Sequence, residues 1–82
     1  MHKISLNRAK KNVKVKVLEI AVGRGADARL SALGLRPGVV VTKISSFALR
    51  GPVTLRIGRS TIAIGHGMAE KIIVDSLPAS SQ

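Results

Sequence analysis

The sequence predicts an all-β domain, namely a small, partly open barrel of about five strands with one or two short helices. The 82 residues include 45% hydrophobic residues, nearly all of them Val, Ile, Leu or Ala. Such β-branched residues favour strands. Short runs of alternating apolar and polar residues recur between glycines and prolines, which is typical of a strand-rich domain. We expect a single domain over residues 1–76 and a flexible tail at 77–82.

The first elements expected are a short turn and a strand. Ser5 can cap a turn over residues 6–10. Val13, Val15 and Val17 then alternate with lysines, which predicts a half-buried strand with one solvent-exposed face. The alternation slips by one residue at Leu18, which leaves two interpretations open. One is a β-bulge that bends the strand, and the other is burial of both faces at the end of the strand.

A two-turn helix is expected next, near residues 27–33. Asp27 is a good N-cap, and Gly34 stands where helices commonly end on a residue with positive φ. Pro37-Gly38 then predicts a tight turn. Proline fixes φ at one central position of such a turn, and glycine takes the positive φ at the next.

The remaining segments are read as strands joined by loops. Loops are expected at 48–52 and at Gly58-Arg59-Ser60, the second of which closes a hairpin. Residues 67–70 form one further turn. The strands are expected at residues 39–47, 53–57, 62–64 and 72–74.

The residue content indicates that the chain is not an enzyme and holds no cofactor. It has no cysteine, two histidines and four scattered acidic residues. This set offers no nucleophile beside a base and no pair of neighbouring carboxylates. His66 and Glu70 are four residues apart and would share one face of a helical turn. Hard cations require several carboxylates together, so we interpret His66 as a surface histidine and expect no metal site.

Two further features indicate a cytoplasmic location. The absence of cysteine fits a reducing compartment. The chain also has no apolar stretch of the length that a transmembrane helix needs, and no signal-peptide pattern follows its basic N-terminus.

Charge is the most pronounced compositional feature, with 14 Lys and Arg against four Asp and Glu, a net charge of +10. Such a field attracts phosphate backbones, anionic lipid or an acidic protein face. Lys14 and Lys16 share the wet side of one strand, here called the basic face. A nucleic-acid-binding small β-barrel is therefore the alternative function. Such barrels usually also stack bases on aromatic side chains, and this chain has only Phe47, so we expect no specific nucleic-acid partner.

Five blocks of the sequence together resemble the FeoA family. Residues 29–38, RLSALGLRPG, resemble its signature R-L-x-x-L-G-[LI]-x-P-G. The other blocks follow in the family's order, and the resemblance as a whole covers about residues 5–75. They are the valine-rich strand Val39–Ile44, then Gly51-Pro52-Val53, then Ile62-Ala63-Ile64, and finally Ala69-Glu70-Lys71-Ile72-Ile73-Val74.

The resemblance implies an SH3-like barrel and a part in bacterial ferrous iron transport. It implies a small cytosolic accessory protein that docks on the cytosolic part of the membrane GTPase-permease FeoB. The protein would thus be peripheral to the membrane through its partner, and transition metal ion binding is a property of the family as a whole. Related domains also occur at the C-terminus of metal-dependent repressors. A weak homo-oligomer stays open.

The partner surface is expected on or beside the short helix. Binding energy concentrates in a few packed anchors, which are usually aromatic, and aromatic residues are nearly absent here. The remaining candidates are Leu30, Leu33 and Leu35, flanked by Arg29 and Arg36. At least one leucine should face the barrel. An exposed leucine and the two arginines would then form an apolar patch with a basic rim.

Overall fold

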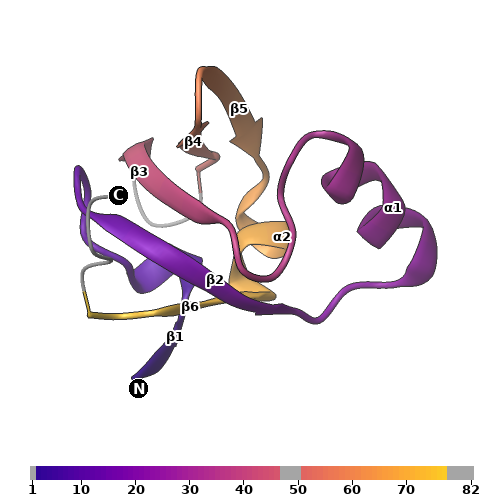
Figure 1. Ribbon diagram of the computed structural model, residues 1–82, viewed down its shortest axis with the longest axis horizontal. Coiled ribbons are helices and arrows are strands. Elements are labelled where there is room, and N and C mark those ends of the chain that lie inside the picture. The colour runs from indigo at the N-terminus through magenta and orange to yellow at the C-terminus, as the bar shows by residue number, and fades with distance from the viewer. Residues whose placement is uncertain (1, 47–50, 78–82) are drawn as a thin grey trace.

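The computed structural model describes residues 2–46 and 51–77 and shows one six-stranded antiparallel sheet with short helices beside it (Figure 1). Parts of the predicted strand at 39–47, loop at 48–52 and tail at 77–82 lie outside the described residues. The strands are β1 (Lys3–Ser5), β2 (Lys14–Ile20), β3 (Val40–Ser46), β4 (Val53–Ile57), β5 (Ser60–Ile64) and β6 (Ile72–Asp75). The helices are the 3-10 helix η1 (Leu6–Arg8), α1 (Arg24–Ala32) and α2 (His66–Glu70). No helix in the described ranges is long and apolar enough to cross a membrane.

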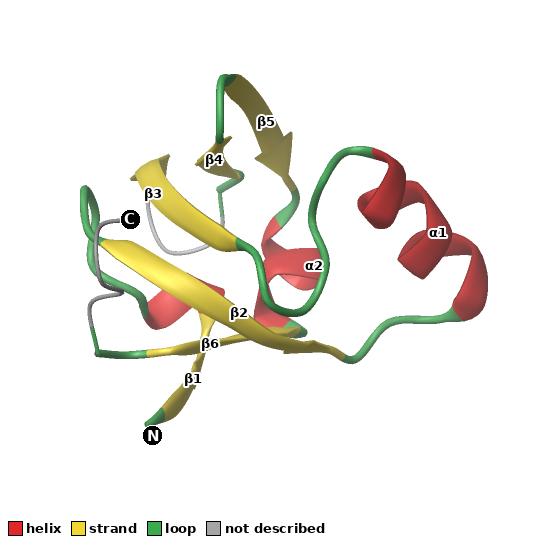
Figure 2. Cartoon of the chain, viewed as in Figure 1, coloured by secondary structure: helices red, strands yellow, loops and turns green. Residues whose placement is uncertain are grey.

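The strands follow the order β1-β6-β2-β3-β4-β5, so that β1 and β5 form the two edges of the sheet. Figure 2 shows how the sheet bends instead of lying flat, with α1 standing beyond its side. The register shifts between Val17 and Glu19 where β2 pairs with β6, which agrees with the first of the two interpretations left open at Leu18, a β-bulge. A second shift lies between Lys43 and Ser45. Bulges increase the bend of a strand, so they help a short sheet to wrap around its core.

The predicted fold class is confirmed, with one strand more than expected. β1 has only three residues, too few to show an alternating pattern in the sequence. It nevertheless pairs with β6, where Ile4 lies opposite the buried Val74. The backbone N–H of Ser76 donates to the carbonyl of His2 at 2.7 Å and extends this pairing.

The core is aliphatic and is built from the inward residues of the alternating strands. Val15 and Val17 of β2 are buried while Lys14 and Lys16 are exposed, as the alternation predicts. Small side chains of similar shape pack without large voids, which suits a domain with so little interior. The buried apolar residues are Leu6, Ala9, Val15, Val17, Leu30, Leu35, Val41, Val53, Leu55, Ile64, Ala69, Ile72 and Val74.

The predicted turns form with the expected chemistry. The hydroxyl of Ser5 accepts from the backbone N–H of Asn7 at 3.2 Å and caps η1. Gly38 has φ of 95°, and the Val39 N–H donates to the Arg36 carbonyl at 3.2 Å across the Pro37-Gly38 turn. In the hairpin, Ile57 pairs with Ser60, which leaves only Gly58 and Arg59 in the loop.

Candidate partner-binding surface

Helix α1 begins three residues earlier than the sequence predicted. Its N-cap is Gly23, in an extended conformation, and Asp27 lies inside the first turn. The prediction that Asp27 is the N-cap was therefore wrong. Gly25 and Ala26 extend the helix towards its N-terminus, and the Asp27 carboxylate still lies near the positive end of the helix dipole.

The C-terminus of α1 ends as the sequence predicted, on Gly34 with φ of 94°. The Gly34 N–H donates to the Ser31 carbonyl at 2.9 Å, and the Leu35 N–H donates to the Leu30 carbonyl at 2.9 Å. This pair of bonds is a Schellman motif, which satisfies the last free carbonyls of the helix and brings the chain back towards the sheet.

The three candidate leucines divide into two anchors and one exposed side chain. Leu30 and Leu35 are buried in the core, whereas 52% of Leu33 is exposed. Leu30 and Leu35 thus fix the helix end to the sheet, and Leu33 is left facing solvent. The chain reverses at Gly34, between Leu33 and Leu35. The turn that brings Leu35 into the core leaves the side chain of Leu33 in solvent.

The two arginines flank this exposed leucine in the sequence, Arg29 four residues before it and Arg36 three residues after it. Arg29 and Arg36 are both exposed. The Arg36 Nη1 donates to the Ser31 carbonyl at 3.2 Å, which holds its side chain back along the helix end. In the described part of the chain neither arginine is in an ion pair. We call Arg29, Leu33 and Arg36 the leucine patch.

The basic face lies apart from the leucine patch. Lys14 and Lys16 are exposed on β2, and Lys14 stands at its first residue. In Figure 1 this end of β2 is on the left and α1 is on the right. The structure therefore does not join the two predicted groups into one site.

His66 and Glu70, the pair considered as a metal site, lie at the two ends of α2. The Nδ2 of Asn7 donates to the Glu70 carboxylate at 2.9 Å and to the His66 carbonyl at 3.1 Å. This amide connects η1 to α2. Among the described residues no three His, Cys, Asp or Glu side chains cluster as a metal site would require.

A buried lysine was missed by the sequence reasoning. Lys43 is only 4% exposed, and its Nζ donates to the carbonyls of Asn7 at 2.9 Å and Leu6 at 3.5 Å. Burial lowers the pKa of Lys43, and the nearby Lys11 cation lowers it further. The signal was present, because Lys43 has the same inward parity in its strand as the buried Val41.

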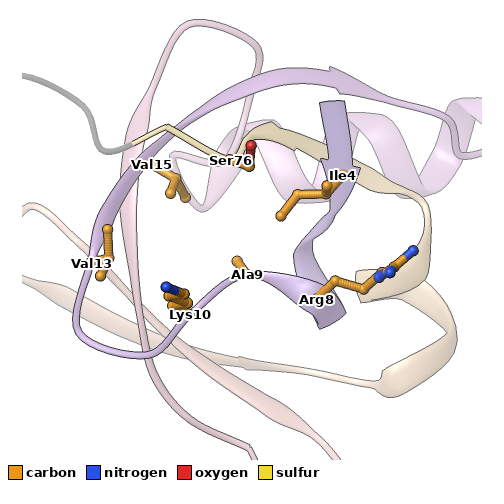
Figure 3. Close-up of a pocket in the computed structure, with 7 residues that line it drawn as sticks. All are labelled: Ile4, Arg8, Ala9, Lys10, Val13, Val15 and Ser76. Atoms are coloured by element: carbon orange, nitrogen blue, oxygen red, sulfur yellow. The ribbon is translucent and has the colours of Figure 1, made fainter. Parts of the chain in front are cut away.

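A small pocket of about 260 Å³ opens between η1, the start of β2 and the end of β6. Figure 3 shows Ile4, Val13 and Val15 around it, with Ala9 at its centre and Lys10 near its edge. Arg8 and Ser76 complete the lining. No pattern in the sequence indicates this pocket, because its walls come from three segments that only the fold brings together.

A bent, six-stranded antiparallel sheet with short helices and an exposed leucine patch defines a small SH3-like β-domain. The chain belongs to the FeoA family, because the sequence model of the FeoA domain matches residues 4–76. This confirms the family resemblance and, with it, the link to ferrous iron transport that the family carries. None of the curated proteins matches the chain significantly in sequence.

Solved structures share this fold. The crystal structure of an iron uptake regulatory protein (FeoA) is 28% identical, with a TM-score of 0.78, over 92% of this chain and 97% of that one. The FeoA protein of Chlorobium tepidum, solved by NMR, is 22% identical with a TM-score of 0.83, over 95% of this chain and 74% of that one. A similar fold occurs in ScaR, solved with bound Zn²⁺, at 18% identity and a TM-score of 0.80, over 93% of this chain and 38% of that one.

Proposed function

We propose that the protein is a cytoplasmic, non-catalytic accessory protein of ferrous iron uptake, which docks on the cytosolic region of a FeoB-like GTPase-permease. Membership of the FeoA family supports the pathway. The names of similar structures, an iron uptake regulatory protein and an iron(II) transport protein A, agree with it. On this proposal the protein reaches the membrane through its partner.

The observation that carries the docking proposal is the exposure of Leu33. It is 52% exposed on a helix end that Leu30 and Leu35 hold in place. Burying a leucine side chain completely contributes about 1.5–3 kcal/mol, so one well-seated leucine makes a useful anchor. Arg29 and Arg36 beside it would speed the encounter with an acidic partner face and fix its orientation.

The test is a pull-down with the isolated cytosolic region of the permease as bait. The variant combines Leu33→Ser with Arg29→Glu and Arg36→Glu, and we expect it to lose binding. Its fold should survive, because the leucines that pack in the core, Leu30 and Leu35, are left intact. Circular dichroism and thermal unfolding of the variant check this.

A matched variant reverses charge on the basic face, with Lys14→Glu and Lys16→Glu. We expect it to bind the bait as the original protein does, because Lys14 and Lys16 belong to β2 and leave the three residues of the leucine patch unchanged. If the leucine-patch variant binds undiminished and the basic-face variant does not, the partner surface is at Lys14 and Lys16 instead.

A further inference from the structure

A row of cationic and hydroxyl side chains crosses four strands on the outer face of the sheet. Lys14 pairs with Thr42, Thr42 with Arg56, and Arg56 with Thr61. Directly opposed residues of neighbouring strands project to the same side of a sheet. Neighbouring strands are about 4.8 Å apart, so Lys14 and Arg56 start roughly 10 Å from each other. We call these four residues the outer row.

The outer row faces solvent. Lys14, Arg56 and Thr61 are exposed and Thr42 is half-buried. The alternate residues Val15, Val41 and Leu55 point into the core. Two residues further along β2, Lys16 lies opposite Val40 of β3, and both are exposed. With the outer row, these two residues bring three cations, two threonine hydroxyls and one exposed valine to the same face.

No carboxylate balances these cations on their own face. The chain contains no acidic residue between Asp27 and Glu70, and none before Glu19. β3, β4, β5 and the first half of β2 are consequently free of acids. Glu19 lies beyond the bulge in β2 and pairs with Lys3 at 3.3 Å. Within residues 2–46 and 51–77, these strands therefore offer the outer row no acidic side chain as a counterion.

We propose that this face docks on the anionic phospholipid surface of a bilayer. This rests on the proposed function, because an accessory protein of iron uptake works beside a membrane. Cations near a charged leaflet each contribute to attraction. The threonine hydroxyls can donate to phosphate oxygens, and Val40 can lie at headgroup depth.

Two other occupants fit the face less well. A single-stranded nucleic-acid site would use aromatic stacking, and none of the four outer-row residues is aromatic. The centre of a protein interface is usually depleted of lysine and enriched in aromatic anchors. The leucine patch belongs to α1 and the turn after it, whereas the outer row belongs to β2, β3, β4 and β5, so the two surfaces share no residue.

Co-sedimentation with vesicles tests the proposal on the whole protein without any permease. One set of vesicles is an equimolar mixture of phosphatidylcholine and phosphatidylglycerol, and the other is phosphatidylcholine alone. We expect partitioning to the anionic vesicles only, and weaker partitioning as salt rises. Each cation in contact with the surface should raise the vesicle partition coefficient about fivefold. The partition coefficient of the variant Lys14→Gln, Lys16→Gln, Arg56→Gln should therefore fall about a hundredfold.

The matched control removes the same net charge elsewhere, with Lys3→Gln, Arg8→Gln and Lys71→Gln. These three side chains are exposed on β1, on η1 and after α2. An equal loss in both variants would show a general effect of net charge and would overturn the proposal, as would no binding of the original protein to anionic vesicles.

Duplex RNA at equal phosphate concentration is added at physiological salt as a competitor. Displacement from the vesicles by the RNA would assign the face to nucleic acid instead. Since no permease is present, failure here leaves the docking proposal untouched.

Discussion

Gly34 stands at the point where α1 turns back to the sheet, with φ of 94°. Side chains other than glycine rarely adopt this conformation, and a Cβ placed here would lie 3.5 Å from the Cγ2 of Ile57. We expect Gly34→Ala to lower the free energy of unfolding by about 1–2 kcal/mol. Urea unfolding followed by circular dichroism measures the difference.

Gly25 gives the matched control. It lies inside α1 with φ in the ordinary range, and an added Cβ meets nothing within 4 Å. Alanine favours helix over glycine, so Gly25→Ala should raise the free energy of unfolding by about 0.5 kcal/mol. Equal effects of the two substitutions on the free energy of unfolding would contradict the view that position 34 needs glycine for its positive φ.

Lys43 makes stability depend on alkaline pH. Its pKa in the folded protein is lowered, first by burial and then by Lys11, below the ordinary lysine value of 10.5. The folded state therefore binds this proton less tightly than the unfolded state. The charged Lys43 amine therefore destabilises the folded state. This destabilisation is fully present at pH values below the pKa of the folded state, and it is relieved as pH rises from that pKa to 10.5.

Comparing the original protein with Lys43→Met between neutral pH and about pH 11 isolates this effect. We expect the free energy of unfolding of the original protein to rise relative to the variant across that window. The chain has no tyrosine or cysteine, so the other groups that titrate there are common to both proteins. Parallel curves would show that Lys43 titrates alike in the folded and unfolded states.

At the scale of elements, the contact between η1 and α2 depends on one amide. Asn7 Nδ2 donates to both the His66 carbonyl and the Glu70 carboxylate. Asn7→Ala should cost about 1–2 kcal/mol of unfolding free energy, and Glu70→Ala less, because the His66 bond remains. Glu70→Gln keeps an acceptor oxygen and should be nearly neutral. A loss as large for Glu70→Gln as for Asn7→Ala would contradict this account.

Sequence reasoning predicted the elements that have a periodic pattern and missed those that depend on distant partners. The alternation of Val15 and Val17 with lysines and the Gly34 helix end are local signals, and both form as expected. The slip at Leu18 is also local, but it left two interpretations open, and the register shift in β2 decides between them. β1 is stable only because β6 lies beside it. The start of α1 was misplaced because Asp27 serves as well in a first turn as at an N-cap.

The candidate site was predicted in composition but not in arrangement. The sequence identified Leu30, Leu33 and Leu35 as a group, but only the packing of the core decides which of them is exposed. The outer row depends on the register of four strands, which no local pattern specifies.

For the molecule as a whole, we expect no tight site for ferrous iron. Among the described residues no cluster of metal-binding side chains forms, and the Glu70 carboxylate is held by Asn7. Calorimetry with ferrous iron on tag-free protein should show no stoichiometric site tighter than micromolar, equivalent to about −8 kcal/mol. A tight site that disappears in His66→Ala would contradict this prediction.

The pairing of β1 with β6 has a consequence for how the protein is made. Lys3 lies opposite Asp75, so the first strand waits for a partner that the ribosome adds after all the other strands. β2 also needs β6 along the length beyond its bulge. The hairpin of β4 and β5 can form during synthesis, because its contacts are local. The β1-β6-β2 half of the sheet closes only after β6 has left the exit tunnel, which makes this half the last part of the sheet to become resistant to proteases.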